Sequence, residues 1–320
     1  MRSVPCGAIG VAASLAVFHA HRLRRPLLIG PALVLAAACS SDRTTPPAAL
    51  SADVRISAEN AVQVGSAVYC TALAPLRVAR LLGGFFEVEP PEDGAPTGLL
   101  VRELEGPEGG SIVFTWDDRD GDGEYSSGDA FVFDCRQYRE GGLELTGAAA
   151  FEDVQLVGNV TDDLNWVLGA SLRCVGLEVA VGSGSSVFDG VLRFDWENRF
   201  TVRVLTVQTV DRFACSARTL LPGTVLVRSE WTSGVPRMDL VLDGATEDPV
   251  LGGVVTCATG PNLSGIRFLP DPSSGRLEVL GAGGSALRLL PLDFFNVTLE
   301  VDHDGDGEVD ASSDAEWAAF

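Results

Sequence analysis

Short apolar segments with alternating polarity fill the chain from residue 98 onward, and this pattern constrains the fold more than any other feature. Typical examples are residues 111–116 (SIVFTW), 130–135 (AFVFDC) and 238–244 (MDLVLDG). Glycine or polar residues separate roughly a dozen such segments by hairpin-length connections. The pattern therefore predicts a mainly β fold, an antiparallel meander that forms a sandwich, an open barrel or a long curved sheet.

Residues 57–83 are the exception, because their apolar residues recur at helical rather than strand spacing. The recurring positions are Ala61, Val64, Val68 and Ala72. Ser57 is a suitable N-cap, and the glycines at 83 and 84 suit the end of a helix. Pro75 removes a helical hydrogen bond, so we expect it to break the run and begin a second short helix. The sequence thus predicts one short helical region before the sheet.

Composition divides the chain into four regions. Residues 87–97 (EVEPPEDGAPT) are an acidic, proline-rich connector between the helix and the strands. We expect an export segment over 1–38, a lipidated cysteine and flexible tether over 39–56, the helix and its connector over 57–97, and an antiparallel β domain over 98–320. A division of the β domain into two halves near residues 215–260 stays open.

Residues 118–129 are the stretch in which residue type and spacing together specify a chemistry. The EF-hand calcium loop supplies oxygen ligands from positions 1, 3, 5, 7, 9 and 12, with glycine at position 6. Counted from Asp118, these ligand positions hold Asp118, Asp120, Asp122, Glu124, Ser126 and Asp129. Gly123 falls at position 6, and Glu124 would offer its main-chain carbonyl. Crowded carboxylates repel one another unless a cation neutralises them, so the spacing predicts a metal site.

This stretch resembles the EF-hand calcium loop, and the resemblance implies bound Ca²⁺. Two departures limit it. The flanking segments are predicted strands, so the helix–loop–helix switch of that family is not implied. Asp129 closes the loop where the family has glutamate, and its shorter side chain makes bidentate ligation harder and calcium binding weaker. The alternative is an acidic Asp-Gly hairpin that needs no metal.

A second copy of the pattern closes the chain. Positions 1, 3, 5, 7 and 9 are filled by Asp302, Asp304, Asp306, Glu308 and Asp310, with Gly307 at position 6. Position 12 is Ser313, and Asp314 comes one residue late. Closure of a metal site would need either a bulge or a larger contribution from Asp310, so metal binding at this loop stays open. The two loops are consistent with a diverged internal repeat.

The N-terminal residues have the features of an export signal. Arg22, Arg24 and Arg25 precede an apolar run at 27–38 (LLIGPALVLAAA), which suits a signal-peptide core and is too short to span a bilayer. Small residues then lead to Cys39. This arrangement resembles the lipobox of bacterial lipoproteins, in which the cysteine is lipidated, except that leucine stands four rather than three residues before it. Ordinary cleavage just before Cys39 is the alternative.

The lipoprotein resemblance also carries an expected location. In some bacteria a serine after the lipidated cysteine, as at Ser40, permits export to the outer membrane. We therefore expect an exported protein anchored there by its lipid, on the periplasmic face or at the cell surface. Residues 7–18 are a further apolar run, which we interpret as sequence upstream of a later start codon because it is short for a membrane span.

Five cysteines lie beyond the export segment and Cys39: Cys70, Cys135, Cys174, Cys215 and Cys257. Their wide spacing lacks CxxC pairs and favours disulfides in an oxidising compartment over zinc. We expect Cys70 to pair with Cys135, and Cys174 with Cys215. The alternative is buried, reduced thiols that act as small apolar residues.

Composition excludes several functions. The net charge of −21 excludes general nucleic-acid binding, which needs a basic face. The chain has no lysine, and only His303 remains once residues 1–38 are removed; we expect it to point to solvent. Lysine chemistry, Ser–His–Asp and Cys–His catalysis, and zinc sites with two histidines are therefore excluded. Paired carboxylates and metals held by oxygens remain.

Taken together, these features resemble a class of uncharacterised bacterial β-rich lipoproteins with DxDxDG loops. The resemblance rests on the export segment and tether, the helix that begins near Ser57, the loop at 118–129 and the terminal DGDG motif. It implies membrane anchoring but no activity. We therefore expect a non-enzymatic structural or binding module that calcium stabilises, with the membrane as one partner and a protein or apolar small molecule as another.

Two other functions stay open. Apolar segments such as 287–295 (LRLLPLDFF) suit a periplasmic carrier of lipid or another apolar ligand in a curved sheet. A glycoside-active enzyme would need two carboxylates, for which Asp195 and Glu197 beside Trp196 are the candidates. Residues two apart on a strand lie about 6.5–7 Å apart on one face. We interpret this pair as part of a solvated sheet face.

Overall fold

Strands make up 61% of the residues that the structure describes and helices 11%, which confirms the predicted mainly β class. The structure is a computed structural model that describes residues 53–83, 98–158, 165–181, 184–199, 202–232, 235–266 and 271–320. Its helices are α1 (Ala61–Gly83) and the short 3₁₀ turns η4 (Ala282–Gly284) and η5 (Trp317–Ala319). Its strands are β1 (Leu99–Glu105), β2 (Ser111–Asp117), β3 (Ala130–Glu140), β4 (Leu143–Val157), β5 (Asn165–Val181), β6 (Gly184–Arg199), β7 (Val202–Thr209), β8 (Phe213–Cys215), β9 (Arg218–Leu220), β10 (Gly223–Thr232), β11 (Val235–Asp248), β12 (Gly253–Thr259), β13 (Leu263–Ile266), β14 (Leu277–Leu280), β15 (Ala286–Pro291), β16 (Asn296–Asp302) and β17 (Ala311–Glu316).

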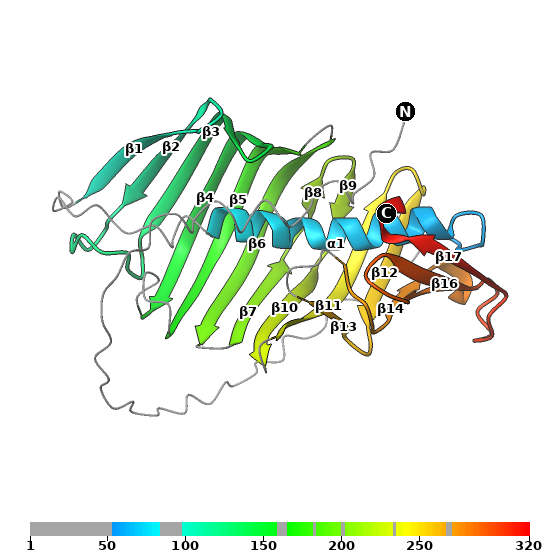
Figure 1. Cartoon of the computed structure of the whole chain (residues 1–320). Coiled ribbons are helices and arrows are strands. Elements are labelled where there is room, and N and C mark those ends of the chain that lie inside the picture. Colours follow the sequence, from blue (N-terminus) through cyan, green and yellow to red (C-terminus); the bar gives the residue numbers. More distant parts are fainter. Residues whose placement is uncertain are drawn as a thin grey trace.

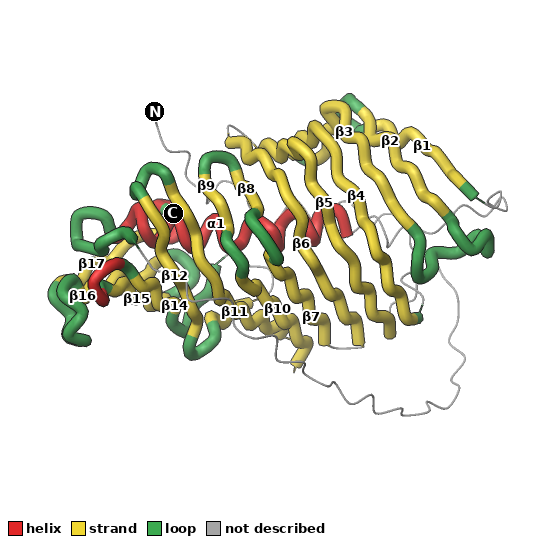
Figure 2. The backbone as a smooth tube through the Cα atoms, turned by 180° about the vertical axis from the view of Figure 1, so that it is seen from behind, coloured by secondary structure: helices red, strands yellow, loops and turns green. Residues whose placement is uncertain are grey.

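The seventeen strands form one antiparallel meander, in which most strands pair with their neighbours in the chain. At three places two short strands lie end to end and share one position in the sheet. The first half of β6 pairs with β8 and the second half with β7, and β11 likewise spans β9 with β10 on one side and β12 with β13 on the other. β1 lies at one end of this long twisted sheet and β17 at the other (Figures 1 and 2). Of the three architectures expected, the long sheet is the one observed.

Side-chain alternation explains why each segment pairs in its particular register. On β2, Ile112, Phe114 and Trp116 are buried, and the residues between them are half-buried. Burial of a large apolar side chain stabilises the fold by about 1.5–3 kcal/mol. A slip of one residue would turn all three toward solvent, so the apolar pattern fixes the register. We call the face that carries these buried side chains the inner face.

Bulges on three neighbouring strands bend the sheet along a common line. The register shifts lie between Cys135 and Tyr138 on β3, Thr146 and Ala148 on β4, and Cys174 and Leu177 on β5. Gly147 has φ 104°, and a Cβ there would lie 2.2 Å from the carbonyl oxygen of Gly176. Only glycine permits both this conformation and this approach. The bulges therefore curve the long strands around the inner face.

α1 crosses the strands on the inner face (Figures 1 and 2), where it packs against β7, β9 to β12, β15 and β16. The helix begins at Ala61 rather than at Ser57. The side chain of Asn60, not that of Ser57, satisfies the main chain at this end, because its Oδ1 accepts a hydrogen bond from Ser57 N at 2.9 Å. No helix in the described ranges is long and apolar enough to cross a membrane.

Pro75 lies inside α1, so the predicted break into two helices is wrong. A proline in a helix interior removes one hydrogen bond and costs about 3 kcal/mol. The flanking residues Leu73, Leu76 and Val78 are all buried in the core. Their burial on both sides of the proline outweighs its cost and keeps the helix continuous.

The C-terminal residues dock onto α1. Phe320 is buried, and its main-chain oxygen accepts a hydrogen bond from Ser66 Oγ at 3.1 Å. The rings of Trp317 and Tyr69 lie 4.8 Å apart. Gly65 makes room for this contact, since a Cβ at that position would lie 2.4 Å from Cε1 of Phe320. The helix is thus held between the inner face and the last residues of the chain.

The substitution Gly65→Ala tests this docking, because the contact with Phe320 decides whether it raises or lowers the free energy of unfolding. Alanine gains about 1 kcal/mol over glycine in a helix interior, but overpacking against Phe320 costs about 1–3 kcal/mol. We expect the substitution to lower the free energy of unfolding in the native chain. In a Phe320→Ala background, where the clash is absent, it should raise that free energy by about 1 kcal/mol. Denaturant unfolding of the four variants measures both effects, and stabilisation in both backgrounds would contradict the docking.

Candidate metal sites in two hairpin loops

The loop between β2 and β3 gathers three of its predicted ligands. Asp118 and Asp129 are buried and Asp120 is exposed, and one carboxylate oxygen from each lies within 4.8 Å of the others. Oxygen atoms at this spacing could hold a metal ion. Asp118 follows β2 and Asp129 precedes β3, so the pairing of these two strands brings the loop ends together.

The turn is built around the carboxylate of Asp118. Its Oδ1 accepts a hydrogen bond from Gly121 N at 2.7 Å, and its Oδ2 accepts one from Gly123 N at 2.9 Å. Both glycines have φ near +75°, at 74° and 77°, which other residues rarely adopt. The DxDGDG sequence therefore supplies both the acceptor and the backbone freedom that the turn requires.

Asp129 connects the loop to the protein core. Its Oδ2 accepts hydrogen bonds from Trp116 Nε1 at 2.9 Å and from Ser126 N at 3.0 Å. The hydroxyl of Ser126 also donates to Asp120 Oδ2 at 2.9 Å. This hydrogen bond, together with one from Asp122 N, lowers the pKa of the Asp120 carboxyl. Trp116 is fully buried, so the closing carboxylate has a fixed position.

The loop between β16 and β17 repeats the same hydrogen-bonded frame. Asp302 Oδ1 accepts from Gly305 N at 2.7 Å and Asp302 Oδ2 from Gly307 N at 2.9 Å. The two glycines again have positive φ, at 81° and 93°. Asp304 and Asp306 then cap the main chain two residues on, as Asp120 and Asp122 do in the first loop. Asp302, Asp304 and Asp306 form the second group of carboxylates that could hold a metal ion.

The two loops differ in how they close. In the first loop, Arg119 N donates to Asp129 at 3.3 Å. In the second, the equivalent N–H of His303 donates to Asp310 Oδ2 at 2.7 Å. Ser313 lies within β17, opposite Leu299, and Asp314 accepts a hydrogen bond from Thr298 Oγ1. Asp310 therefore takes the closing role in the second loop, and the expected position 12 is part of the strand.

The remaining predicted ligands lie beside the clusters rather than in them. Asp122 accepts a hydrogen bond from Glu124 N at 2.7 Å, and its carboxylate is outside the first group of three. The side chains of Glu124 and Glu308 are both exposed, and at position 7 of their loops it is the main-chain carbonyl that would contribute. Ser126 contributes through hydrogen bonds to two of the carboxylates.

Residues before α1 pack against the second loop, which the sequence did not indicate. His303 is exposed, but its Nδ1 lies 2.9 Å from the carbonyl oxygen of Ile56. Ile56 is fully buried, and its N–H donates to Ser285 Oγ at 2.9 Å. Ala282 N donates to the carbonyl of Val54 at 2.7 Å. Alternating apolar residues at 54 and 56 are the sequence signal that could have indicated this docked segment.

The predicted disulfides are wrong. Cys135, Cys174, Cys215 and Cys257 are buried thiols and form no disulfide. Cys135 lies on β3, whereas Cys70 lies on α1 with its Sγ 3.3 Å from the main-chain oxygen of Phe320, at the other end of the sheet. Cys174 and Cys215 are offset by two residues across β6, opposite Gly190 and Phe188 respectively. These four cysteines are widely spaced in the sequence because each occupies a core position on a different strand.

Burial makes these thiols poor nucleophiles. It raises the pKa of Cys135, Cys174 and Cys257 to about 12, so they remain protonated at neutral pH. They act as small apolar residues of the core, which was the alternative interpretation. These four thiols give no support for an oxidising compartment, whereas Cys70 is disulfide-bonded.

The carboxylates considered for glycoside chemistry lie on the outer face of β6, opposite to buried Phe194. Glu197 is paired with Arg199 at 3.1 Å. Trp196 packs against Trp166, with ring centroids 5.4 Å apart. Neither carboxylate lines the cavity between α1 and the sheet.

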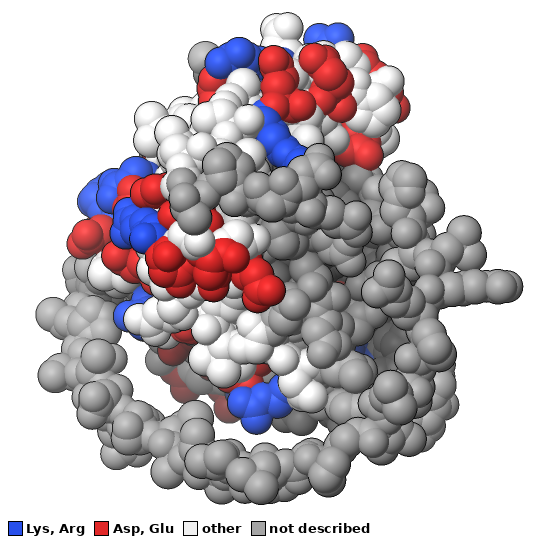
Figure 3. Space-filling model, turned by 90° about the vertical axis from the view of Figure 1, so that its left-hand side faces the viewer, with Lys and Arg blue, Asp and Glu red and all other residues white. Residues whose placement is uncertain are grey.

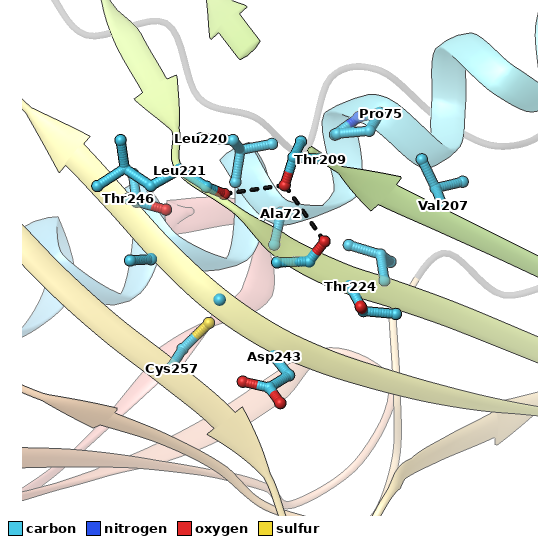
Figure 4. A pocket seen from close by; sticks show the side chains of 14 residues that line it. Ala72, Pro75, Val207, Thr209, Leu220, Leu221, Thr224, Asp243, Thr246 and Cys257 are labelled. Carbon is cyan, nitrogen blue, oxygen red and sulfur yellow. Dashed lines mark hydrogen bonds between the residues drawn. The ribbon is translucent and has the colours of Figure 1, made fainter. Parts of the chain in front are cut away.

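A small cavity lies between α1 and the sheet (Figure 4). It has a volume of about 20 Å³. Its lining includes Ala72 and Pro75 of α1 and Asp243 and Cys257 of the sheet, and at its edge Thr209 Oγ1 lies 2.8 Å from the carbonyl oxygen of Leu221. A space of this size holds about one water molecule.

Acidic side chains gather in groups on the end of the molecule that Figure 3 shows, with arginines beside them. Several arginines form exposed ion pairs, such as Arg119 with Asp117 at 3.2 Å and Arg136 with Asp134 at 2.8 Å. Exposed pairs of this kind stabilise a protein by about 0–1 kcal/mol. The surface charge is therefore compatible with cation binding but does not identify a binding site.

No protein-family model, curated protein or solved structure matches this chain. The predicted lipidation residue Cys39 and the export segment lie outside the described residues. The evidence for the two candidate metal sites is therefore the geometry of their loops.

The two hydrogen bonds that Asp118 accepts from Gly121 N and Gly123 N have a structural role that can be measured without metal. In the presence of a chelator, we expect Asp118→Ala to lower the free energy of unfolding by roughly 1–3 kcal/mol, because two loop N–H groups lose their acceptor. Asp122→Ala removes one exposed hydrogen bond from the same loop and should cost no more than about 0.5 kcal/mol. If both substitutions lower the free energy of unfolding equally in denaturant unfolding, the hydrogen bonds to Asp118 do not hold the loop.

Proposed function

We propose that this protein is an exported, lipid-anchored, non-enzymatic module in which calcium stabilises two hairpin loops of a long β-sheet. In this proposal the lipid is attached at Cys39 and holds the protein on the bacterial outer membrane. The sheet then acts as a structural or binding module for a partner protein or small molecule.

The repeated loop frame is the observation that carries the proposal. Two loops, far apart in the sequence, place an aspartate at position 1 under two glycine N–H groups with matching distances. Each also gathers three carboxylates. A hairpin turn alone does not need three carboxylates, and their mutual repulsion would favour other residues there. A shared need for a cation explains why both loops gather three carboxylates, the third from Asp129 in the first loop and from Asp306 in the second.

Calcium is the cation that these ligands suit best. The clusters contain only carboxylates, and hard oxygen ligands favour Ca²⁺ or Mg²⁺ over the softer transition metals. Each carboxylate oxygen of Asp118 and Asp302 already accepts one N–H, but it retains a second lone pair. Main-chain carbonyls at Glu124 and Glu308 and water molecules would complete a flexible shell, which calcium tolerates and magnesium does not. The short closing aspartates imply a Kd on the order of 10⁻⁴–10⁻³ M.

Support for export and lipidation comes from the sequence alone. It consists of the arginine patch, the apolar run at 27–38 and the small residues before Cys39. An extracytoplasmic location agrees with weak calcium sites, because calcium there can be present at constant, high concentration. The buried thiols are compatible with this location, since they are shielded from oxidants.

No observation in the described residues favours the carrier of lipid or another apolar ligand. The inner face beneath α1 is filled by the helix, and the cavity there has a volume of about 20 Å³. An acyl chain does not fit in such a space. The structural or binding module therefore remains the better-supported function.

Calcium should raise the melting temperature of the full chain. At ten times Kd, one site adds about 1.4 kcal/mol, and each kcal/mol shifts the midpoint of a protein this large by about 2–4 °C. We expect Asp118→Asn and Asp302→Asn each to reduce the shift, and the double variant to abolish it. Asp195→Asn, with the same charge change on the outer face of β6, is the control. A shift that survives in the double variant, or no shift at all, would refute the calcium proposal.

Lipidation at Cys39 can be tested by metabolic labelling. In a bacterial host that processes lipoproteins, the full chain should incorporate labelled palmitate and fractionate with membranes. Cys39→Ala should abolish both, whereas Cys6→Ala should leave both unchanged. Label retained in Cys39→Ala would contradict this anchor.

A further inference from the structure

The inner face of β2 to β6 carries a row of large apolar side chains. Strand pairing places one residue of each strand directly opposite the next, in the order Trp116, Phe131, Phe151, Leu172 and Leu192. All five side chains are at most 1% exposed, and we call them the apolar row. A single layer of sheet cannot bury its own apolar face, so the burial of this row requires a second layer.

Among the described elements, α1 supplies this second layer over only part of the sheet. It packs against β7, β9 to β12, β15 and β16. Figures 1 and 2 show it running from the β17 end of the sheet toward β5, short of β1 and β2. At the other end of the row, the ring of Tyr125 packs on Trp116 and Phe131, with centroids 4.9 and 5.4 Å apart. The stretch between Tyr125 and the end of α1 needs a further segment to cover it.

The path of the chain brings one segment to this stretch. α1 ends at Gly83 on the inner face, directly after the fully buried Leu82. The next described residue is Gly98, whose carbonyl oxygen accepts a hydrogen bond from Asp118 N at 3.2 Å; Asp118 directly follows β2. Residues 84–97, which lie outside the described ranges, therefore connect the middle of the inner face to the end of β2. The direct route between these points follows the apolar row.

The length and composition of residues 84–97 fit this route. Neighbouring strands lie about 4.8 Å apart, so the distance from β5 to β1 is about 19 Å. The segment reaches about 46–50 Å when extended, which is more than enough to cross the row. Phe85, Phe86 and Val88 come first, and acidic residues and prolines follow. The apolar part is thus the part nearest the end of α1, where the chain lies over the inner face.

We propose that residues 84–88 cross the inner face of β3 to β5 in an extended conformation, with Phe86 and Val88 packed on the apolar row. Alternate side chains of an extended segment point to the same side. Burial of the unpaired charge of Glu87 against apolar side chains would be costly, so Glu87 faces away and its two neighbours face the row. Phe85 then points to the same side as Glu87, away from the sheet.

This arrangement supplies the second layer where α1 does not reach. The chain itself occupies this part of the inner face, which leaves no apolar surface there for a lipid or a second copy of the protein. The contact involves neither the acidic loops nor Cys39. It therefore stands or falls independently of calcium binding and lipid attachment.

Hydroxyl-radical footprinting of the full native chain tests the burial of Phe86 without any substitution. Phe295, which is 72% exposed, and the fully buried Phe151 are internal references of the same residue type. We expect Phe86 to be oxidised at the slow rate of Phe151, because the apolar row shields its ring from the radical. Oxidation of Phe86 as fast as that of Phe295 would overturn the proposal.

Photo-cross-linking identifies the surface that covers Phe86. The substitution Phe86→p-benzoylphenylalanine keeps an aromatic side chain, and after irradiation it should attach to peptides of β3 to β5 in a product of unchanged chain mass. Phe295→p-benzoylphenylalanine, at the exposed turn after β15, is the control and should attach to none of these peptides. A product of twice the chain mass would identify a second copy as the occupant, and an attached lipid would identify an apolar ligand; either result refutes the proposed contact.

Two adjacent alanine variants test which side chain faces the row. Phe86→Ala should lower the melting temperature by about 10 °C, because it leaves a cavity over the row. Phe85→Ala removes the same atoms from the side that faces away and should have a much smaller effect. Equal effects of the two substitutions, or a larger effect at Phe85, would contradict the proposed orientation.

Discussion

Two buried aspartates, Asp118 and Asp302, set the turns on which both ends of the sheet depend. Each accepts hydrogen bonds from two glycine N–H groups at 2.7 and 2.9 Å. The first turn joins β2 to β3 near one end of the sheet, and the second joins β16 to β17 at the other (Figure 1). The β16–β17 hairpin ends the sheet and has a neighbouring strand on one side only, β15, so it should open most readily. The β2–β3 hairpin lies one strand in from the other end, between β1 and β4.

The close spacing of these carboxylates has an electrostatic cost. Asp118, Asp129 and Asp302 are buried, and other carboxylates lie within 4.8 Å of them. Hydrogen bonds from main-chain N–H groups offset part of the desolvation of each carboxylate, but they leave the mutual repulsion in place. A bound cation would remove the repulsion and tie the two strands of each hairpin to one centre. In the second loop the cation would lie next to the segment before α1, because His303 contacts Ile56.

Local patterns in the sequence predicted the features that depend on local chemistry. The alternation of Ile112, Phe114 and Trp116 fixed a strand, and the aspartate and glycine spacing fixed both turns. Features that depend on distant contacts could not be predicted in this way. Pro75 stays helical because of buried neighbours, the cysteines lie on separate strands, and Ser313 belongs to β17 because of its register with Leu299. Each of these outcomes is decided by packing across the sheet rather than by neighbouring residues.

The stoichiometry of calcium binding tests the central claim most directly. Isothermal titration of the full chain should give two ions per chain, one lost in Asp118→Asn and the other in Asp302→Asn. Both loops share one frame, so both should bind, with affinities that differ because Asp129 and Asp310 close them differently. A chain that binds no calcium, or that binds the same number of ions in both variants, would contradict the account.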